Sequence, residues 1–77
     1  MNWYKIAKKK WERVDSSFIK AVSFDKDLHV LSVRLKSGAV YNFKDVTKDV
    51  YKDLVASQSK GKFFNKNLKD QYDWSKE

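Results

Sequence analysis

Hydrophobic and polar residues alternate through the middle of the chain, a pattern typical of β-strands with one buried face. Residues 31–36 carry hydrophobic side chains at every second position, and residues 39–44 continue in the same way. Between them, Ser37-Gly38 indicates a hairpin turn, because glycine readily adopts a positive φ. An earlier hydrophobic stretch, residues 18–24, ends in the polar turn sequence Asp25-Lys26-Asp27. The pattern therefore predicts a three-stranded antiparallel β-meander.

After the third predicted strand, the spacing of hydrophobic residues changes to that of a helix. Thr47 is well suited as an N-cap, because its hydroxyl can accept a hydrogen bond from a free backbone N–H. The hydrophobic face of this first helix is formed by Val50, Tyr51, Leu54 and Val55. Gly61 is expected to end it in a left-handed conformation. A second helix follows, and its hydrophobic face is formed by Phe64, Leu68 and Tyr72.

Strands followed by helices predict an α+β fold. The expected architecture is a three-stranded antiparallel β-meander followed by two short α-helices packed on one sheet face. Residues 1–10 are interpreted as a basic and aromatic N-terminal extension, and residues 11–77 as a single domain. The residues expected to form one core are Leu31, Val33, Leu35, Tyr41, Phe43, Val50, Leu54, Phe64 and Leu68.

The length and composition favour a small binding module over an enzyme. A chain of 77 residues buries only about 60% of its unfolded surface, which leaves little room for an enclosed catalytic cavity. The chain has no cysteine and one histidine, so no disulfide, metal, cofactor or catalytic residue is expected. It has neither a signal-peptide pattern nor a hydrophobic stretch of membrane-spanning length. A cytoplasmic location without membrane contact is therefore expected.

The net charge of +7 favours an anionic partner. Positive residues gather near both ends of the chain, and the candidate nucleic-acid-binding residues are Lys8, Lys9, Lys10, Arg13, Lys60, Lys62, Lys66 and Lys69. Lys60 opens the second helix, where free backbone N–H groups attract anions. Lys62, Lys66 and Lys69 are expected to point outward along that helix. The alternative for these lysines is an ordinary solvated helix face.

Two motifs resemble catalytic or metal-binding sequences but lack the necessary partners. Ser16-Ser17 would need a nearby base to act as a nucleophile, and His29 is the sole imidazole. The simpler interpretation is that these hydroxyls bond backbone groups at the entrance to the first strand. Asp25-Lys26-Asp27 begins like a calcium-binding loop, but Val30 and Lys36 occupy positions that such a loop reserves for glycine and glutamate.

Strand parity places Tyr41 and Phe43 on the face toward the helices, so core packing is favoured over base stacking. The opposite face is expected to be polar and basic and without an aromatic ring, and it carries Ser32, Arg34, Lys36, Asn42 and Lys44. Sheets that bind single-stranded RNA stack bases on exposed rings. This opposite face is therefore not expected to bind RNA in that way.

Several of these segments occur together in the order and spacing of a known family. They are Val14-Asp15-Ser16-Ser17, Phe24-Asp25, Leu31-x-Val33-x-Leu35-x-x-Gly38-x-Val40-Tyr41-Asn42-Phe43, Val46, Ser59-Lys60-Gly61-Lys62-Phe63-Phe64-Asn65, Leu68 and Tyr72. From about Trp11 to Tyr72 the chain resembles the KTSC domain, a module named for its occurrence at the C-terminus of some lysyl-tRNA synthetases. Members also occur as small stand-alone proteins in bacteria and their phages. The resemblance implies the α+β fold, and its synthetase context suggests RNA binding.

The sequence thus predicts a small, non-enzymatic binding module. The leading hypothesis is weak, salt-dependent RNA binding through the lysine-rich surfaces, dominated by phosphate contacts. The alternative is a protein-binding module that docks on an acidic surface of a partner and modulates it. The sequence carries no signal for the oligomeric state.

Overall fold

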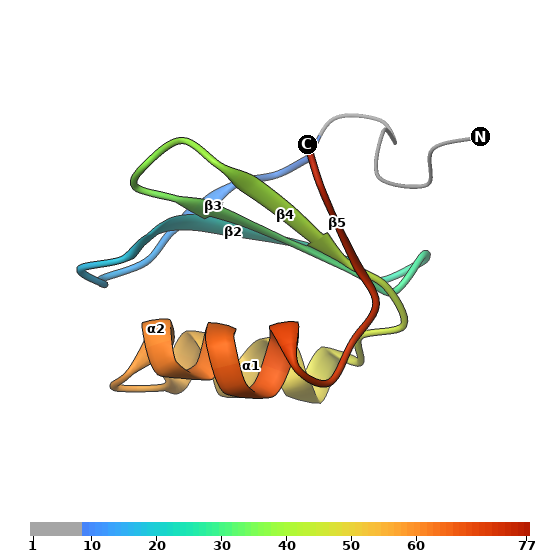
Figure 1. The fold of residues 1–77 in the computed structure, drawn as a ribbon. Helices are drawn as coiled ribbons and strands as arrows, with labels where there is room; N and C mark the ends of the chain where they lie inside the picture. The colour runs from blue at the N-terminus through green and yellow to red at the C-terminus, as the bar shows by residue number, and fades with distance from the viewer. Residues whose placement is uncertain (1–8) are drawn as a thin grey trace.

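The computed structural model describes residues 9–77, and its strands form one antiparallel sheet (Figure 1). The strands are β1 (Glu12–Arg13), β2 (Ile19–Asp25), β3 (Val30–Leu35), β4 (Val40–Phe43) and β5 (Trp74–Lys76), and they lie in this order across the sheet. The predicted meander corresponds to β2, β3 and β4, and the predicted α+β class is confirmed. The prediction of a three-stranded sheet is wrong, because two short edge strands extend it to five.

The two edge strands are defined by pairing between distant segments. β1 has two residues and β5 has three, too few for alternation to identify a strand. β1 pairs with β2 at Glu12 and Val22, and β5 pairs with β4 at Lys76 and Tyr41. These segments are therefore extended because they pair with β2 and β4, and not because of their own sequence pattern.

Both turns of the meander form as predicted. Gly38 joins β3 to β4 with a φ of 99°, and its N–H donates to the Leu35 carbonyl at 2.9 Å. The Asp25 carboxylate accepts hydrogen bonds from the backbone N–H groups of Asp27 and Leu28, each at 2.9 Å. This side-chain bonding closes the turn between β2 and β3, which is a common role of aspartate.

Two helical segments follow the meander. α1 (Lys48–Ala56) has the predicted N-cap, because the Thr47 hydroxyl accepts a hydrogen bond from the Val50 N–H at 3.4 Å. The second segment begins as α2 (Lys60–Phe63) and continues without a break as a π-helix, η1 (Phe64–Lys69). No helix in residues 9–77 has the length and hydrophobicity needed to span a membrane.

The connection between the two helical segments differs from the prediction. α1 ends at Ala56, and Ser57 follows in an extended conformation. Gly61 lies inside α2 with ordinary helical angles, so the prediction that it ends the first helix in a left-handed conformation is wrong. Tyr72, predicted on the second helix, lies beyond its end and packs against the core.

Both helical segments lie on one face of the sheet, as predicted (Figure 1). α1 lies beside β1 and β2: the Tyr51 ring stacks on Phe24 with centroids 5.3 Å apart, and the Tyr51 hydroxyl donates to the Glu12 carboxylate at 3.1 Å. Partial burial, together with this bond to Glu12, raises the pKa of Tyr51. η1 lies beside β4, where the Phe64 ring meets Phe43 edge to face with centroids 5.7 Å apart.

The core fills the space between the sheet and the helices. Seven of the nine predicted core residues are buried in it, and the other two, Tyr41 and Val50, are partly buried and pack against it. Three further buried members escaped prediction: Ile19, Val22 and Val46. The pairing of β2 with β3 shifts between Ile19 and Ala21, and this irregularity breaks the alternation that would have identified Ile19 and Val22. Val46 lies in the connection between β4 and α1, outside any periodic pattern. Val55 is 38% exposed, so its predicted place on the buried face of α1 is wrong.

Candidate nucleic-acid interface

A partly exposed group of aromatic and lysine side chains lies at the β4–β5 edge of the domain, on the helical side of the sheet. This group, the aromatic–lysine patch, consists of Tyr41, Lys69, Trp74 and Lys76. The Tyr41 and Trp74 rings meet edge to face with centroids 5.2 Å apart. The Lys69 ammonium lies 5.0 Å from the Trp74 centroid and 5.2 Å from the Tyr41 centroid. The Lys76 ammonium lies 5.8 Å from the Tyr41 centroid, and Trp74 is 41% exposed.

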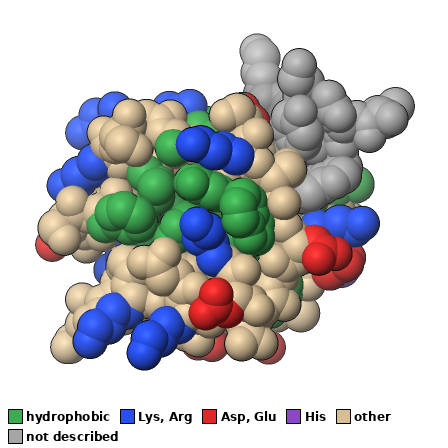
Figure 2. Space-filling view, in the orientation of Figure 1, with side chains coloured by type: hydrophobic (Ala, Val, Ile, Leu, Met, Phe, Trp, Pro, Cys, Tyr) green, Lys and Arg blue, Asp and Glu red, His purple; other side chains and the backbone are tan. Residues whose placement is uncertain are grey.

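Strand pairing and the second helix bring the patch together. Tyr41 pairs with Lys76, and Trp74 lies two residues earlier in β5, so all three side chains share one face. Lys69 ends η1 and reaches the same face from the helical layer, while the Phe64 ring packs against Tyr41 with centroids 5.3 Å apart. Figure 2 shows hydrophobic side chains gathered on this side, between the sheet and α2, with lysine or arginine side chains among them.

The patch combines the two kinds of group that bind single-stranded nucleic acids. The exposed face of an aromatic ring can stack with a base of any identity. An ammonium group can neutralise a phosphate, and cation–π attraction holds it close to a ring in the absence of ligand. Base-binding and phosphate-binding groups therefore lie within about one side-chain length of each other.

The predicted helical lysines have different environments. Lys62 and Lys66 are exposed, and they continue the positive charge of the patch along α2 and η1. Lys69 is half-buried against the two rings, so the prediction that it points outward is wrong. Lys60 is half-buried as well, and its ammonium donates to the Ser57 carbonyl at 2.8 Å. Lys60 therefore stabilises the end of α1 instead of extending the patch.

The N-terminal candidates do not join the patch. Arg13 is exposed on β1, at the opposite edge of the sheet from β5, and Lys10 is exposed just before that strand. Lys9 forms an ion pair with the Glu77 carboxylate. Lys8 and the rest of the proposed extension before it lie outside the described residues. The described candidates are therefore divided between two regions of the domain and do not form one surface.

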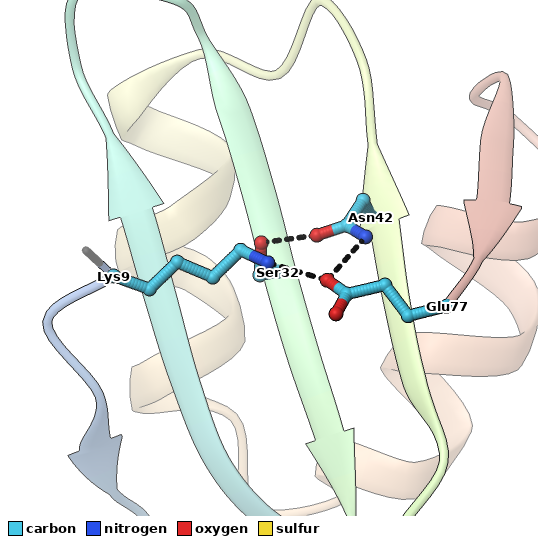
Figure 3. A network of polar contacts seen from close by, with 4 residues as sticks. All are labelled: Lys9, Ser32, Asn42 and Glu77. Atoms are coloured by element: carbon cyan, nitrogen blue, oxygen red, sulfur yellow. Dashed lines mark hydrogen bonds and ion pairs between the residues drawn. The ribbon is translucent and has the colours of Figure 1, made fainter. Parts of the chain in front are cut away.

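The sheet face opposite the helices is polar, as predicted, but part of it is buried. Ser32 and Asn42 are buried, and the Ser32 hydroxyl donates to the side-chain oxygen of Asn42. The Asn42 amide in turn donates to the Glu77 carboxylate at 2.9 Å, which also binds Lys9 (Figure 3). Partial burial alone would raise the pKa of Glu77, but hydrogen bonds from Lys9 and Asn42 and the charges of Lys9 and Arg34 hold it below its usual range.

This same face carries an aromatic ring, contrary to the prediction. The Trp11 ring lies 4.5 Å from the guanidinium carbon of Arg34, with the Lys9 ammonium 5.9 Å from its centroid. Trp11 is half-buried in this arrangement. Lys36 and Lys44 are exposed, as predicted.

The motifs that resembled catalytic and calcium sites have structural roles. The Ser16 hydroxyl accepts hydrogen bonds from the backbone N–H groups of Phe18 and Ile19, each at 3.1 Å, as predicted for the entrance to β2. The Asp25 carboxylate is engaged in its own turn, and His29 is exposed there with a φ of 56°. Within residues 9–77, no cluster of three or more potential metal-ligating side chains occurs.

Sequence reasoning missed Trp74 and Lys76 as site residues. Both belong to β5, which is too short to be recognised from its own pattern. One signal could have identified Trp74: its large ring stands alone between Asp73 and Ser75, outside any predicted hydrophobic face. A large apolar side chain in a polar segment either buries itself through distant contacts or contributes to a binding surface.

A five-stranded antiparallel sheet with two helical segments on one face defines a small α+β domain, here with an aromatic–lysine patch at one edge. Residues 15–72 match the family model of the KTSC domain, and the chain belongs to this family.

Similar proteins and structures agree with this assignment. The chain is 36% identical over 59 residues to a protein of Tsukamurella paurometabola, a match that covers 77% of this chain and 88% of that protein. It is 34% identical over 58 residues to the lysine–tRNA ligase of Nostoc punctiforme, covering 75% of this chain and 10% of the ligase. The crystal structure of a KTSC domain protein from Yersinia pestis has the same fold, with a TM-score of 0.84 at 23% identity and coverage of 91% and 99% of the two chains.

Proposed function

We propose that this KTSC domain binds single-stranded RNA, weakly and in a salt-dependent manner, at the aromatic–lysine patch. The observation that carries the proposal is the exposed Trp74 ring beside Tyr41, with the Lys69 ammonium within 5.2 Å of both ring centroids. A base stacked on Trp74 would place its phosphates near Lys69 and Lys76. Because stacking and phosphate contacts are both insensitive to base identity, little sequence preference is expected.

Single-stranded RNA suits the patch better than a duplex. Stacking on a protein ring needs a base that has left its own helix, and such bases occur in loops and single strands. Two rings offer room for about one or two bases, and a site of this size binds weakly. Lys62 and Lys66 would hold the phosphates on the helical side of those bases.

The relatives and the charge support a nucleic acid as the partner. The name of the similar lysine–tRNA ligase specifies a tRNA, and this chain matches a segment of that enzyme. A net charge of +7 attracts any polyanion and accelerates its association. The role proposed is binding without catalysis, because the Ser16 hydroxyl is occupied by backbone N–H groups.

The stacking contact can be tested by fluorescence anisotropy with a labelled single-stranded RNA at several salt concentrations. Replacing one stacking ring with alanine removes about 1–3 kcal/mol of binding free energy. Trp74→Ala is therefore expected to weaken binding by about 5-fold to 150-fold. Trp74→Phe retains a ring and should recover most of the affinity, whereas Leu28→Ala, at an exposed apolar residue in the β2–β3 turn, should have no effect.

The lysine contacts can be tested through the salt dependence of binding. Each phosphate neutralised on a single strand contributes about 0.7 to the slope of log K against log salt. Replacing Lys62, Lys66 and Lys69 with glutamine should therefore lower the slope by about 2. The control replaces Lys26, Lys48 and Lys52, which are exposed near the β2–β3 turn and on α1. It removes the same charge and should leave the slope nearly unchanged.

The absence of binding to single-stranded RNA at low salt would refute the proposal. Binding that survives Trp74→Ala unchanged would move the site away from the aromatic–lysine patch, to Lys10 and Arg13 at the other edge.

An acidic protein segment is the second candidate, favoured by the position of β5 as an edge strand. The backbone groups of Asp73 and Glu77 face β4, since the Asp73 carbonyl accepts from Lys44 and the Glu77 N–H donates to Val40. The backbone groups of Trp74 and Lys76 therefore point away from β4 by strand alternation. An extended acidic peptide could pair with them and place carboxylates near the patch lysines. A glutamate-rich peptide that binds while RNA does not would favour this function.

A further inference from the structure

A network of polar side chains, linked by hydrogen bonds and an ion pair, lies on the sheet face opposite the aromatic–lysine patch. Its members are Ser32 on β3, Asn42 on β4, Glu77 after β5, and Lys9 before β1. Figure 3 shows the Lys9 side chain reaching across the sheet toward Glu77, which turns back toward Asn42. This network therefore connects the segment that follows β5 to the middle of the sheet and to the segment that precedes β1.

The side chain of Asn42 is fully buried, so its polar atoms need hydrogen-bond partners within the protein. A buried amide is tolerated when its hydrogen bonds are made, and leaving one unmade is destabilising. The Asn42 oxygen accepts from Ser32, and its nitrogen donates to the Glu77 carboxylate at 2.9 Å. If β5 moved away from β4, the amide of Asn42 would lose this acceptor. The buried side chain of β4 therefore favours the docked position of β5.

β5 has few other means of keeping its place. It has three residues, of which Trp74 and Lys76 are exposed and Ser75 is half-buried. Its three residues pair with Tyr41, Asn42 and Phe43 of β4, and its flanking residues add two backbone hydrogen bonds, from the Lys44 N–H to the Asp73 carbonyl at 3.0 Å and from the Glu77 N–H to the Val40 carbonyl at 2.9 Å. Edge segments with little buried surface are the first to open in a folded protein.

The two faces of the sheet are joined through β4 and β5. Asn42 and Tyr41 are neighbours in β4, and their side chains point to opposite faces. Across the strand pair, Tyr41 faces Lys76 and Asn42 faces Ser75. The position of β5 that satisfies Asn42 on one face is therefore the position that sets Trp74 and Lys76 beside Tyr41 on the other.

We infer that Asn42 and Glu77 are positioning residues for the aromatic–lysine patch: they fix β5 against β4 and thereby hold Trp74 and Lys76 in place. The effect on RNA affinity rests on the proposed function, whereas the effect on β5 does not. The two can therefore be measured separately.

The position of β5 can be measured by NMR on the full chain carrying Glu77→Ala. Amide hydrogen exchange at residues 75 and 77 should accelerate by about tenfold or more, while the amide of Val33 in β3, which reports global unfolding, keeps its protection. The NOE contacts between the Trp74 and Tyr41 rings should weaken. Glu77→Gln keeps an oxygen that can accept from Asn42, so it should retain most of the protection.

The RNA readout separates positioning from a simple charge effect. Glu77→Ala removes one negative charge from a basic protein, a change that by itself strengthens RNA binding. The control Asp70→Ala removes the same charge from an exposed residue just after η1, whose side chain has no hydrogen bond within residues 9–77. We expect tighter binding for Asp70→Ala and severalfold weaker binding for Glu77→Ala.

The outcomes distinguish the two proposals. Unchanged exchange at residues 75 and 77 in Glu77→Ala would overturn the positioning role, whatever happens to RNA binding. Accelerated exchange together with tighter RNA binding by both variants would keep the positioning of β5 and overturn the aromatic–lysine patch as the RNA site. If the parent protein binds no RNA and the exchange still accelerates as expected, the positioning of β5 stands and the proposed function fails.

Discussion

Gly61 offers a sharp test of the structure, because alanine at this position should stabilise the domain. If Gly61 ended a helix in a left-handed conformation, replacing it with a residue that has a side chain would destabilise the domain. Gly61 instead has helical angles in the first turn of α2. A Cβ atom added there would meet the Cβ atom of Phe18 at 3.5 Å and its ring atoms at 3.6 and 3.7 Å. These are ordinary van der Waals distances, so a methyl group fits without displacing the ring.

The expected gain follows from helix propensity. Glycine is about 1 kcal/mol less favourable than alanine in a helix interior, mainly because alanine loses less backbone entropy on folding. Gly61 lies in the first helical turn, so the expected stabilisation of Gly61→Ala is about 0.5–1 kcal/mol. For a domain of this length, that corresponds to a rise in Tm of about 2–8 °C.

Thermal unfolding followed by circular dichroism and a denaturant titration would measure this change. Gly38→Ala is the matched control, because Gly38 has a φ of 99° and open space around its missing Cβ. Its cost should come from the backbone alone, at about 1–2 kcal/mol of destabilisation. The two alanine variants should therefore differ in sign. A Gly61→Ala variant that melts below the parent would refute the helical conformation of Gly61 and restore the left-handed helix end.

Four further predictions concern single side chains. Thr47→Ala should lower stability by about 1 kcal/mol in denaturant titrations, because the Val50 N–H loses its cap; an unchanged midpoint would show that the cap contributes nothing. Ser32→Ala should destabilise by about 1–3 kcal/mol, since the buried oxygen of Asn42 loses its donor. Ser75→Ala should be neutral or stabilising, because the buried Ser75 hydroxyl has no partner within residues 9–77; equal losses for the two serines would contradict this difference. The depressed pKa of Glu77 means that its contribution to stability is present above its unfolded pKa and is lost as the pH falls through its folded pKa. Acid titration of the parent should therefore show a loss that Glu77→Gln lacks, and identical profiles would exclude this contribution.

The features predicted correctly depend on residues that are close in the sequence. Alternation identified β3 and β4, a hydrophobic stretch indicated β2, and the N-cap and the glycine turn followed from single residues at element boundaries. The nine predicted core residues all lie in the core or pack against it, because periodicity determines which face a side chain occupies.

The features predicted wrongly depend on distant segments. β1 and β5 are extended because β2 and β4 offer free edges, and no pattern within two or three residues can express that. A glycine near a helix boundary is compatible with the end of one helix or the start of the next, and the Phe18 ring beside Gly61 is a tertiary contact. Asn42 is at an outward position that normally meets water, and its burial accompanies contacts from distant segments such as Glu77.

The candidate site contains residues predicted from local spacing and residues that only distant contacts bring together. Lys62, Lys66 and Lys69 were predicted from their spacing on one helix, but the partner rings come from β4 and β5. Tyr41 was predicted to pack in the core. It does lie on the face toward the helices, but its position near the edge of the sheet leaves it half-buried. A residue at the margin of a thin core can serve both the core and the surface, and parity alone does not separate these roles.

The position of Lys69 gives a physical reason for expecting weak binding. Its ammonium lies over both Tyr41 and Trp74, and such cation–π contacts contribute about 0.5–1 kcal/mol at exposed sites. A base that stacks on the same face of Trp74 has to displace the ammonium, so the lost cation–π contact offsets part of the stacking free energy. The displaced ammonium can then meet a phosphate of the same nucleotide, which returns an electrostatic gain that falls as salt rises. The net affinity is therefore small and salt-dependent, because the group that binds the phosphate is the group that covers the ring when no RNA is present.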